Sequence, residues 1–272
     1  MKLSVAIVVH RSDLGEVGCC LESIAEALTV LVATEPCQAV VSLVDNSLDE
    51  AYSKRLDHIV TELKLPVGSY LKHRVLDENQ VYGSANNVLL NSLDSTYHLV
   101  LNPDVVLDKD ALLECMDFMR ENPDVALLSP RIREPNKTYS HVIKSYPSCF
   151  ALFLRYLASA RLLRTFGSYL DKYSRKDLDG SVASDVALVG GCFMFMKTLD
   201  FKSIGGFDHR FFLYFEDFDL SVRLRTLGRI SYVPSVLITH SGGDVGRKAF
   251  RHHRFFIMSA VRFFNKYGWK LC

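Results

Sequence analysis

Short apolar runs alternate with longer amphipathic stretches over roughly the first 130 residues, and this alternation limits the fold more than any other feature. Continuous apolar runs between helices are typical of parallel strands in a sheet covered on both faces. We therefore predict an α/β fold with strands at 3–9, 39–44, 69–76, 97–101 and 125–129. The helices predicted between them span 14–32, 50–64, 84–93 and 109–122.

The rest of the chain has a less regular pattern. The elements expected there are an apolar helix over 149–166, two short strands around a Gly-Gly turn within 185–197, an aromatic loop running into a helix over 205–228, two strands within 230–240 and a basic helix over 247–266.

Polar residues follow directly after three of the predicted strands. These are His10, the pair Asp45 and Asn46, and the triplet Asn102, Pro103 and Asp104. Proline cannot donate to a ladder, so the strand at 97–101 must end here. In parallel sheets, ligands bind beyond the carboxyl ends of the strands. We therefore expect the three groups to converge on one crevice.

An acidic cluster marks the start of the helix within 205–228. Capping and solvation are the ordinary explanation for such a cluster. Helical phase separates its members, because Asp219 can pair with Arg223 four residues later, whereas Asp217 shares a face with leucines and points toward the domain. An inward carboxylate at a helix start is a candidate general base. We assign that role to Asp217 and assign acceptor binding or support to Glu216.

His240 ends an apolar strand, immediately before Ser241. A single histidine there is usually just a satisfied polar residue. A neutral imidazole and the carboxylate of Asp104 could also ligate one divalent cation, with diphosphate oxygens completing the shell. The stiff turn at Pro103 would then serve to hold Asp104 against the metal.

Composition narrows the class of protein. The net charge of +1 gives no support for nucleic-acid binding, although 247–272 holds seven Lys or Arg and no Asp or Glu. The seven cysteines include no C-x-x-C pair, which favours reduced thiols in a cytoplasmic protein. The run 3–9 is too short for a signal peptide, and we expect no stretch to reach the ~18 apolar residues of a membrane span. The protein is expected to be soluble or to sit on a membrane surface.

The motifs VVH, LVDNS, NQVYGSANN, LVLNPDVVL, VGGCFMFMK, GGFDHRFFLYFEDFDLSVRLR and VLITHSGG occur in this order. Together they resemble the inverting GT-A glycosyltransferases of family 2, and among these the bacterial O-antigen-type rhamnosyltransferases. The resemblance covers about residues 3–265. It implies a GT-A domain over 1–246 with a mixed central sheet, divided into a nucleotide-sugar-binding half (1–130) and an acceptor half (131–246), followed by a basic aromatic helix over 247–272.

The resemblance also implies roles for single residues. Donor-binding positions fall on Val8, Val9, His10, Asp45, Asn79, Gly83, Asn87 and Asn102. Asp104 and His240 correspond to metal or diphosphate contacts, and Asp217 corresponds to the catalytic base. Gly190 and Gly191 would shape the acceptor side together with Glu216. Asn102 replaces the first carboxylate of the D-x-D motif, and His10 stands where the family often has asparagine.

The implied reaction is a direct displacement that inverts the sugar's configuration. Asp217 removes a proton from an acceptor hydroxyl, and a Mg²⁺ or Mn²⁺ ion at Asp104 neutralises the departing diphosphate. The resemblance points to dTDP-L-rhamnose as donor and to a lipid-linked or lipopolysaccharide acceptor in surface polysaccharide synthesis. A UDP-sugar donor and a catalytically inactive nucleotide-sugar-binding module remain alternatives. A nucleotidyltransferase is disfavoured, because no Gly-rich basic loop follows the first strand.

The C-terminal residues 247–272 interleave cations with aromatic side chains. This pattern suits a helix lying on an anionic membrane leaflet, which would place the protein at the inner face of the cytoplasmic membrane. It suits equally an amphipathic helix packed on the domain. No nucleic-acid recognition motif accompanies it.

Overall fold

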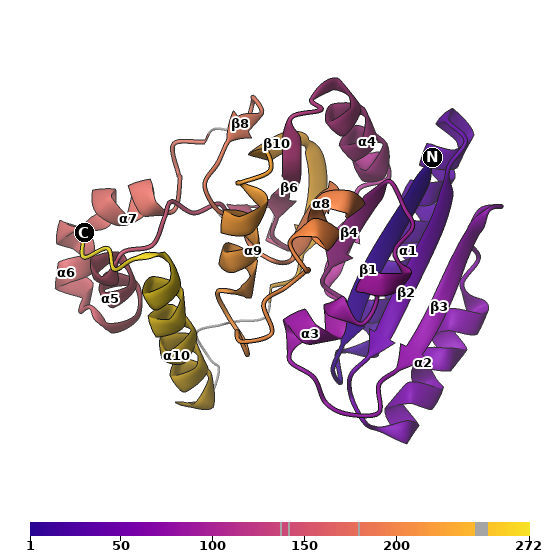
Figure 1. Cartoon of the computed structure of the whole chain (residues 1–272), viewed down its shortest axis with the longest axis horizontal. Coiled ribbons are helices and arrows are strands. Elements are labelled where there is room, and N and C mark those ends of the chain that lie inside the picture. The colour runs from indigo at the N-terminus through magenta and orange to yellow at the C-terminus, as the bar shows by residue number, and fades with distance from the viewer. Residues whose placement is uncertain (137, 141, 179, 243–249) are drawn as a thin grey trace.

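The computed structural model describes the chain except for residues 137, 141, 179 and 243–249. One sheet runs through it in the order β3-β2-β1-β4-β9-β6-β10-β5 (Figure 1). Its first half is parallel, as predicted from the alternation of strands and helices. This half consists of β1 (Lys2–Val9), β2 (Gln38–Asp45), β3 (Ser69–Val75) and β4 (Tyr97–Leu101).

The second half of the sheet changes direction. Strand β9 (Phe193–Lys197) runs antiparallel to both β4 and β6 (Val125–Arg133). Strand β10 (Arg229–His240) is parallel to β6, and the short β5 (Val105–Leu107) lies antiparallel to its end. Two short strands, β7 (Tyr139–Ser140) and β8 (Ser184–Asp185), pair with β6 and β10. The sheet is therefore mixed.

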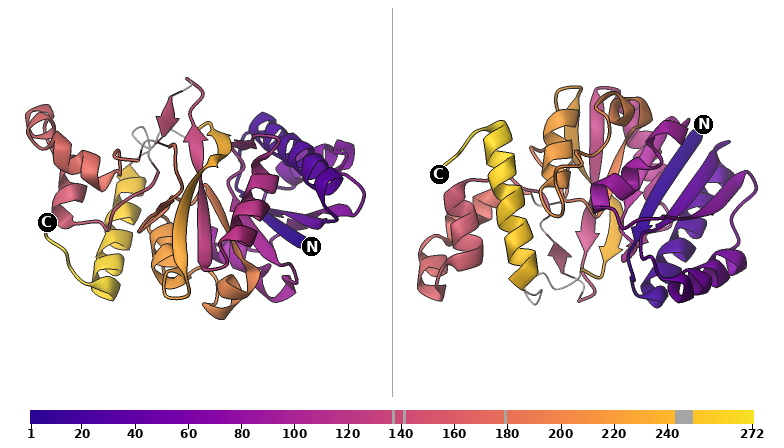
Figure 2. Two further views of the ribbon diagram at one scale, coloured as in Figure 1. Left: turned by 90° about the horizontal axis from the view of Figure 1, so that it is seen from above. Right: turned by 60° about the horizontal axis from the view of Figure 1, so that its bottom comes forward.

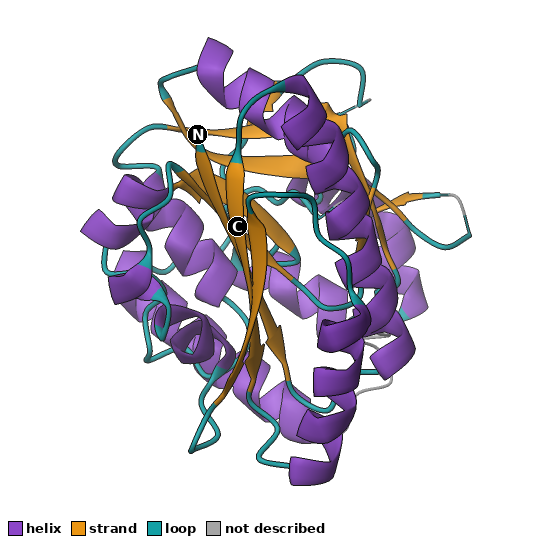
Figure 3. Ribbon diagram, turned by 90° about the vertical axis from the view of Figure 1, so that its right-hand side faces the viewer, coloured by secondary structure: helices purple, strands orange, loops and turns teal. Residues whose placement is uncertain are grey.

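Helices cover both faces of this sheet (Figure 3). One apolar cluster joins one face to α1 (Leu14–Thr34), α2 (Glu50–Glu62) and α4 (Ala111–Glu121). A second cluster joins the other face to α3 (Tyr82–Asn87), the 3₁₀ turn η1 (Leu90–Ser92), α8 (Thr198–Ser203) and α9 (Glu216–Leu224). Burial on both faces accounts for the continuous apolar runs in the sequence.

By length and composition alone, helix α1 could cross a membrane. The expectation that no stretch of the chain reaches this length and apolarity was therefore wrong. Half of that stretch is buried inside the molecule. The Asp13 carboxylate caps its start by accepting from two backbone N–H groups. Cys20, Ile24, Leu28 and Leu31 are fully buried in the first apolar cluster, so α1 acts here as a core helix.

The remaining helices gather at one end of the molecule (Figures 1 and 2). They are α5 (Cys149–Leu157), α6 (Ala160–Thr165), α7 (Gly167–Tyr173) and α10 (Phe250–Tyr267). Helix α10 packs through a third apolar cluster on the loop before α9. The boundary predicted at residues 246 and 247, like the first residues of the predicted basic helix, lies outside the described residues.

Four predicted elements differ from the structure. Of the strand expected before the Gly-Gly turn within 185–197, only β8 and an isolated bridge at Leu188 form. Residues 230–240 form one strand, because a shift in register between Val233 and Leu237 accommodates Pro234, which has no N–H to donate. The helix expected over 149–166 breaks at Ala158, which adopts an extended conformation. The helix expected over 84–93 ends at Asn87 and is followed by η1. The predicted α/β class is confirmed.

Candidate active site

The chain turns sharply between β4 and β5, at Asn102, Pro103 and Asp104. The Asn102 N–H donates to the Cys192 carbonyl at 2.9 Å, and the Asn102 carbonyl accepts from the Val105 N–H at 3.3 Å. Pro103 cannot continue the ladder because it has no N–H. Asp104 is thereby held just beyond the carboxyl end of β4.

The Asp104 carboxylate lies against the imidazole of His240. The pairing of β10 with β5 places His240 opposite Val105, and the Ser241 N–H donates to the Asp104 carbonyl at 3.1 Å. Asp104 Oδ2 lies 3.2 Å from His240 Nε2, and about one fifth of each side chain is exposed. Strand pairing thus brings together two residues that are far apart in the sequence.

The Asp104 carboxylate and the His240 imidazole offer two potential ligands for a divalent cation. A carboxylate and an imidazole are both ligands of such ions. Among the described residues there is no group of three or more His, Cys, Asp or Glu suited to a metal. A cation here would need further ligands, such as water or a bound anion, to complete its shell. The pair therefore fits a divalent cation that is held partly by groups outside the protein.

Asp217 lies in the first turn of α9, and both of its carboxylate oxygens accept backbone hydrogen bonds. The Gly191 N–H donates to Oδ2 at 3.0 Å, and the Phe218 N–H donates to Oδ1 at 2.8 Å. A Cβ on Gly191 would lie 3.2 Å from the Asp217 Cβ, so this close approach leaves little room for a side chain at position 191. Burial raises the pKa of Asp217 although these hydrogen bonds lower it. The result is a fixed carboxylate with a raised proton affinity, which suits a general base.

Glu216 lies beside Asp217 and is close to Tyr82. Its Oε2 atom is buried and has no hydrogen-bond partner within the described part of the chain. Burial, followed by the charge of Asp217, raises the pKa of Glu216. The Tyr82 hydroxyl donates to Asn102 Oδ1 at 2.9 Å, and burial, followed by the charge of Glu216, raises the pKa of Tyr82. The sequence analysis missed Tyr82, which carries no distinguishing signal within the run NQVYGSANN.

The two residues before α9 have a strained backbone. Tyr214 and Phe215 have φ values of 69° and 64°, in the left-handed region that bulky residues rarely adopt. Such conformations cost about 1–3 kcal/mol each and persist where packing enforces them. Phe215 is buried in the third apolar cluster. This packing fixes the entry of the chain into the turn that carries Glu216 and Asp217.

A cleft of about 450 Å³ opens at this edge of the sheet. Its lining comes from the ends of β1 and β2, the loop before α3, the turn after β4 and the loop before α9. The residues are Val8, His10, Ser12, Glu16, Asn46, Asn79, Gln80, Val81, Tyr82, Asn102, Pro103, Asp104, Phe212 and Leu213. Glu16, which the sequence analysis also missed, has its pKa raised by burial, then by Asp104 and Asp13.

Asn46 organises one wall of the cleft. Its Nδ2 donates to the Gln80 carbonyl at 2.7 Å, and its Oδ1 accepts from the Gln80 N–H at 2.8 Å. Its carbonyl oxygen lies 2.7 Å from His10 Nδ1. The loops after β1 and β2 are thereby tied to the loop before α3. Asn46 was expected at this edge because it follows β2, and it lines the cleft.

Cys192 connects the two chemical parts of the site. This thiol, just before β9, is buried, and burial followed by the charges of Asp104 and Asp217 raises its pKa to about 12. Both carboxylates therefore lie close enough to Cys192 for their charges to act on it. The turn after β4 and the start of α9 form one site around the first residues of β9.

Solved glycosyltransferase structures share this architecture. S. aureus TarS in complex with UDP matches 97% of this chain and 66% of its own, with a TM-score of 0.59 and 16% identity. The mannosyltransferase PcManGT from Pyrobaculum calidifontis, in complex with GDP-Man and Mn²⁺, matches 96% of this chain and 64% of its own, with a TM-score of 0.61 and 14% identity. The chain has the GT-A glycosyltransferase fold.

Curated relatives of this GT-A chain are rhamnosyltransferases. An N-acetylglucosaminyl-diphospho-decaprenol L-rhamnosyltransferase of Mycobacterium tuberculosis is 28% identical over 162 residues, which are 57% of this chain and 52% of the relative. Rhamnosyltransferase WbbL of Escherichia coli is 25% identical over 185 residues, 63% of this chain and 66% of the relative. The chain thus spans about half the length of the mycobacterial relative. No family model matches the sequence. These relatives confirm the predicted resemblance and agree with the predicted enzyme class.

Four of the predicted donor-binding residues, Val9, Asp45, Gly83 and Asn87, lie outside the lining of the GT-A cleft. Val9 is fully buried in the apolar core. Asp45 is also fully buried, where Oδ1 accepts from the Ser47 N–H at 2.9 Å and Oδ2 lies 3.8 Å from His73 Nε2. In this structure Asp45 fixes the turn after β2.

Gly83, Asn87 and Gly190 serve packing in this structure. A Cβ on Gly83 would lie 2.8 Å from the Phe207 Cβ. The Asn87 side chain bonds both the N–H and the carbonyl of Phe207, at 2.9 and 2.7 Å. A Cβ on Gly190 would meet Val142 at 3.2 Å. The first two residues thus hold α3 against the loop that leads to α9.

Proposed function

We propose that this chain is an inverting glycosyltransferase that moves a sugar from a nucleotide diphosphate to a hydroxyl group of a saccharide acceptor. The observation that carries the proposal is the arrangement around Cys192, where the half-buried Asp217 and the Asp104–His240 pair meet at one edge of the sheet. A base and a site for diphosphate charge are the two parts that such a displacement needs.

Each step uses a residue in a defined position. The Asp217 carboxylate accepts the proton of the acceptor hydroxyl, and the hydroxyl oxygen bonds to the anomeric carbon. The bond from that carbon to the diphosphate oxygen breaks, and its electron pair leaves with the nucleotide diphosphate. Asp104 and His240 would hold a Mg²⁺ or Mn²⁺ ion, which supplies positive charge next to the diphosphate. The bonds from Gly191 and Phe218 keep Asp217 in one orientation during the proton transfer.

The names of the relatives support a particular donor and acceptor. Two relatives are named rhamnosyltransferases, which supports a rhamnosyl nucleotide such as dTDP-L-rhamnose. The name of the mycobacterial relative includes a diphospho-decaprenol acceptor, which supports a lipid-linked acceptor in surface polysaccharide synthesis at the cytoplasmic membrane. The solved neighbours were crystallised with UDP or GDP-Man, so a UDP-sugar is the second candidate donor.

Thermal shifts with dTDP, UDP and GDP, each with Mn²⁺, Mg²⁺ or EDTA, test the donor site. A ligand at 100 times its Kd adds about 2.7 kcal/mol to the free energy of unfolding. We expect the largest shift with dTDP and a metal ion, and a smaller shift in EDTA. A preference for UDP would change the sugar, and no shift with any nucleotide would contradict the proposed function. Nucleotide binding without transfer to any saccharide would instead indicate an inactive binding module.

A further inference from the structure

Helix α10 has one face packed on the molecule and one face exposed. Ser259, Ala260, Phe263 and Phe264 are buried, and three of them belong to the third apolar cluster. The opposite face exposes large apolar side chains: Ile257 at 61%, Met258 at 48% and Val261 at 40%. Truncation of α10 would therefore remove part of the core, whereas substitutions on its outer face leave the core intact.

Charged contacts fix the orientation of α10. Asp219 of α9 is fully buried, and its Oδ1 accepts from Lys266 Nζ at 2.5 Å and from the Tyr267 hydroxyl at 2.7 Å. Lys266 also bonds Asp208 at 2.8 Å. This buried polar network fixes α10 in one orientation, with its apolar face outward. The exposure of that face therefore does not come from loose attachment of the helix.

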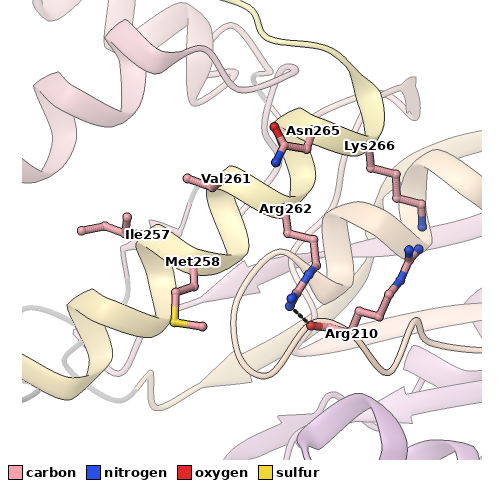
Figure 4. Close-up of a pocket in the computed structure, with 7 residues that line it drawn as sticks. All are labelled: Arg210, Ile257, Met258, Val261, Arg262, Asn265 and Lys266. Atoms are coloured by element: carbon pink, nitrogen blue, oxygen red, sulfur yellow. Dashed lines mark hydrogen bonds between the residues drawn. The ribbon is translucent and has the colours of Figure 1, made fainter.

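The cationic side chains at the C-terminal part of α10 turn toward the molecule, while the apolar ones turn away from it. A hollow of about 500 Å³ beside α10 is lined by Arg210, Ile257, Met258, Val261, Arg262, Asn265 and Lys266. Figure 4 shows Ile257 and Val261 pointing away on one side of the helix, while Arg262 and Lys266 point toward the segment that carries Arg210. Arg254, one turn before Ile257 and Met258, is exposed, and an exposed apolar helix face beside such a cation is typical of helices that lie in a membrane interface.

Helix α6 provides a second element of the same character. All six of its residues are exposed, including Leu162 and Leu163, and it also carries Arg161 and Arg164. A short helix that buries no side chain gains little from packing on its own molecule. The C-terminal segment hydrogen-bonds to the start of α5 through Lys270 and Leu271. Helices α5 and α6 therefore lie next to the C-terminal end of α10 (Figures 1 and 2).

The charge of these elements distinguishes between two possible partners. Residues 149–166 and 247–272 contain no Asp or Glu. In a symmetric dimer the same patch meets itself, so arginines would face arginines without compensating carboxylates. An anionic lipid surface instead offers complementary charge to both helices. The composition of the patch favours the lipid surface over a second copy of the chain.

We propose that α6 and the outer face of α10 form a docking surface for an anionic phospholipid bilayer. The same contacts connect this surface to the cleft. Phe212, which lines the cleft, stacks on Phe255 of α10 with ring centres 4.4 Å apart, and Ser259 Oγ donates to the Leu213 carbonyl at 2.8 Å. The docked helix would hold the cleft near the bilayer, where a lipid-linked acceptor resides. Binding to lipid requires neither donor nor acceptor, so it is tested independently of the proposed function.

Cosedimentation with phosphatidylcholine vesicles, prepared with and without phosphatidylglycerol, tests this surface. We expect the wild-type chain to bind only the anionic vesicles. Ile257→Glu with Val261→Glu should abolish binding without lowering the Tm, because both side chains are exposed. Leu199→Glu, on the equally exposed face of α8, should bind like wild type. Arg164→Gln and Arg254→Gln should each weaken binding roughly fivefold, whereas Lys64→Gln on the other half of the molecule should not.

Two results would overturn the proposal. The first is a folded wild-type chain that does not bind anionic vesicles, or that binds them equally well after the paired glutamate substitutions. The second is a dimer in solution that the paired substitutions convert to a monomer, because it would assign this surface to a second copy of the chain. Transfer activity, or its absence, affects neither result.

Discussion

The two sides of the first turn of α9 place neighbouring carboxylates in opposite surroundings. Asp219 is fully buried among Arg223, Lys266 and Tyr267, which satisfy both of its oxygens. Asp217 is half-buried on the other side of the turn, and within the described part of the chain its oxygens accept hydrogen bonds from backbone N–H groups. A carboxylate paired with cations stabilises the fold, while a half-buried carboxylate without a cationic partner among the described residues has a raised affinity for a proton. The comparison shows how one helix turn can serve both structure and chemistry.

Removing the structural carboxylate should have the largest effect on stability. Asp219→Ala leaves Arg223 and Lys266 without their buried partner, which costs about 3 kcal/mol and lowers the Tm by roughly 6–12 °C. Thermal unfolding measures this loss. Asp94→Asn removes an exposed ion pair with Lys2 and should leave the Tm unchanged. An Asp219→Ala variant as stable as Asp94→Asn would contradict the assignment of Asp219 to the fold.

As the pH falls, transfer activity that depends on Asp217 should be lost before the stability that depends on Asp219. Because the pKa of Asp217 is raised, this group binds a proton as the pH falls, at values where an ordinary carboxyl group is still ionised. We expect kcat/KM to fall about tenfold per pH unit on the acid side, with a midpoint well above the ordinary Asp value of about 3.9. A midpoint at that ordinary value, measured where the protein stays folded, would contradict the assignment of Asp217 as a base with a raised pKa.

Gly191→Ala should lower activity without lowering stability, because it displaces Asp217 and not Asp219. The new Cβ would lie 3.2 Å from the Asp217 Cβ, so the carboxylate must shift by a few tenths of an ångström. We expect kcat to fall roughly tenfold, because misplacement of a catalytic group by about 1 Å can cost 100-fold, while the Tm changes little. Gly18→Ala, in the interior of α1 with no atom within 4 Å of its new Cβ, is the matched control and should retain full activity. Equal activity of the two variants would contradict the positioning role of Gly191.

Glu216→Gln should stabilise the protein slightly. The raised pKa of Glu216 means that the charged form is disfavoured in the folded state, so stability is lost as the pH rises through the ordinary Glu range toward the raised value. A neutral amide avoids this cost, and we expect a gain of about 1 kcal/mol at pH 7 that disappears at pH 4. Thermal unfolding at both pH values measures it. A loss of stability at pH 7 would indicate that the glutamate has a charged partner.

The parallel half of the sheet could be predicted from the sequence because its signals are local. Each buried strand is a continuous apolar run, and each end is marked by a polar residue such as His10 or Asn102. The order of the second half depends on pairings such as β5 with β10, which join residues more than 100 positions apart. No local pattern specifies such a pairing.

Only part of the environment of the site residues could be predicted from the sequence. Helical phase separated Asp219 from Asp217, and the pairing of Asp219 with Arg223 is confirmed at 2.7 Å. The same phase could not show that Lys266 and Tyr267 from the other end of the sequence complete the environment of Asp219. Asn46 was expected at the crevice, but its role was not: its side chain bonds the main-chain atoms of Gln80, which the residue type does not reveal.

Transfer by Asp217→Asn under donor saturation tests the central claim most directly. The measurement compares the rate of sugar transfer from dTDP-L-rhamnose with the thermal shift produced by dTDP and a metal ion. We predict a rate about 10²–10⁴ lower than that of wild type, with an unchanged nucleotide shift, because only the proton acceptor is lost. A rate within tenfold of wild type, in a variant that still binds dTDP, would contradict the assignment of Asp217 as the base.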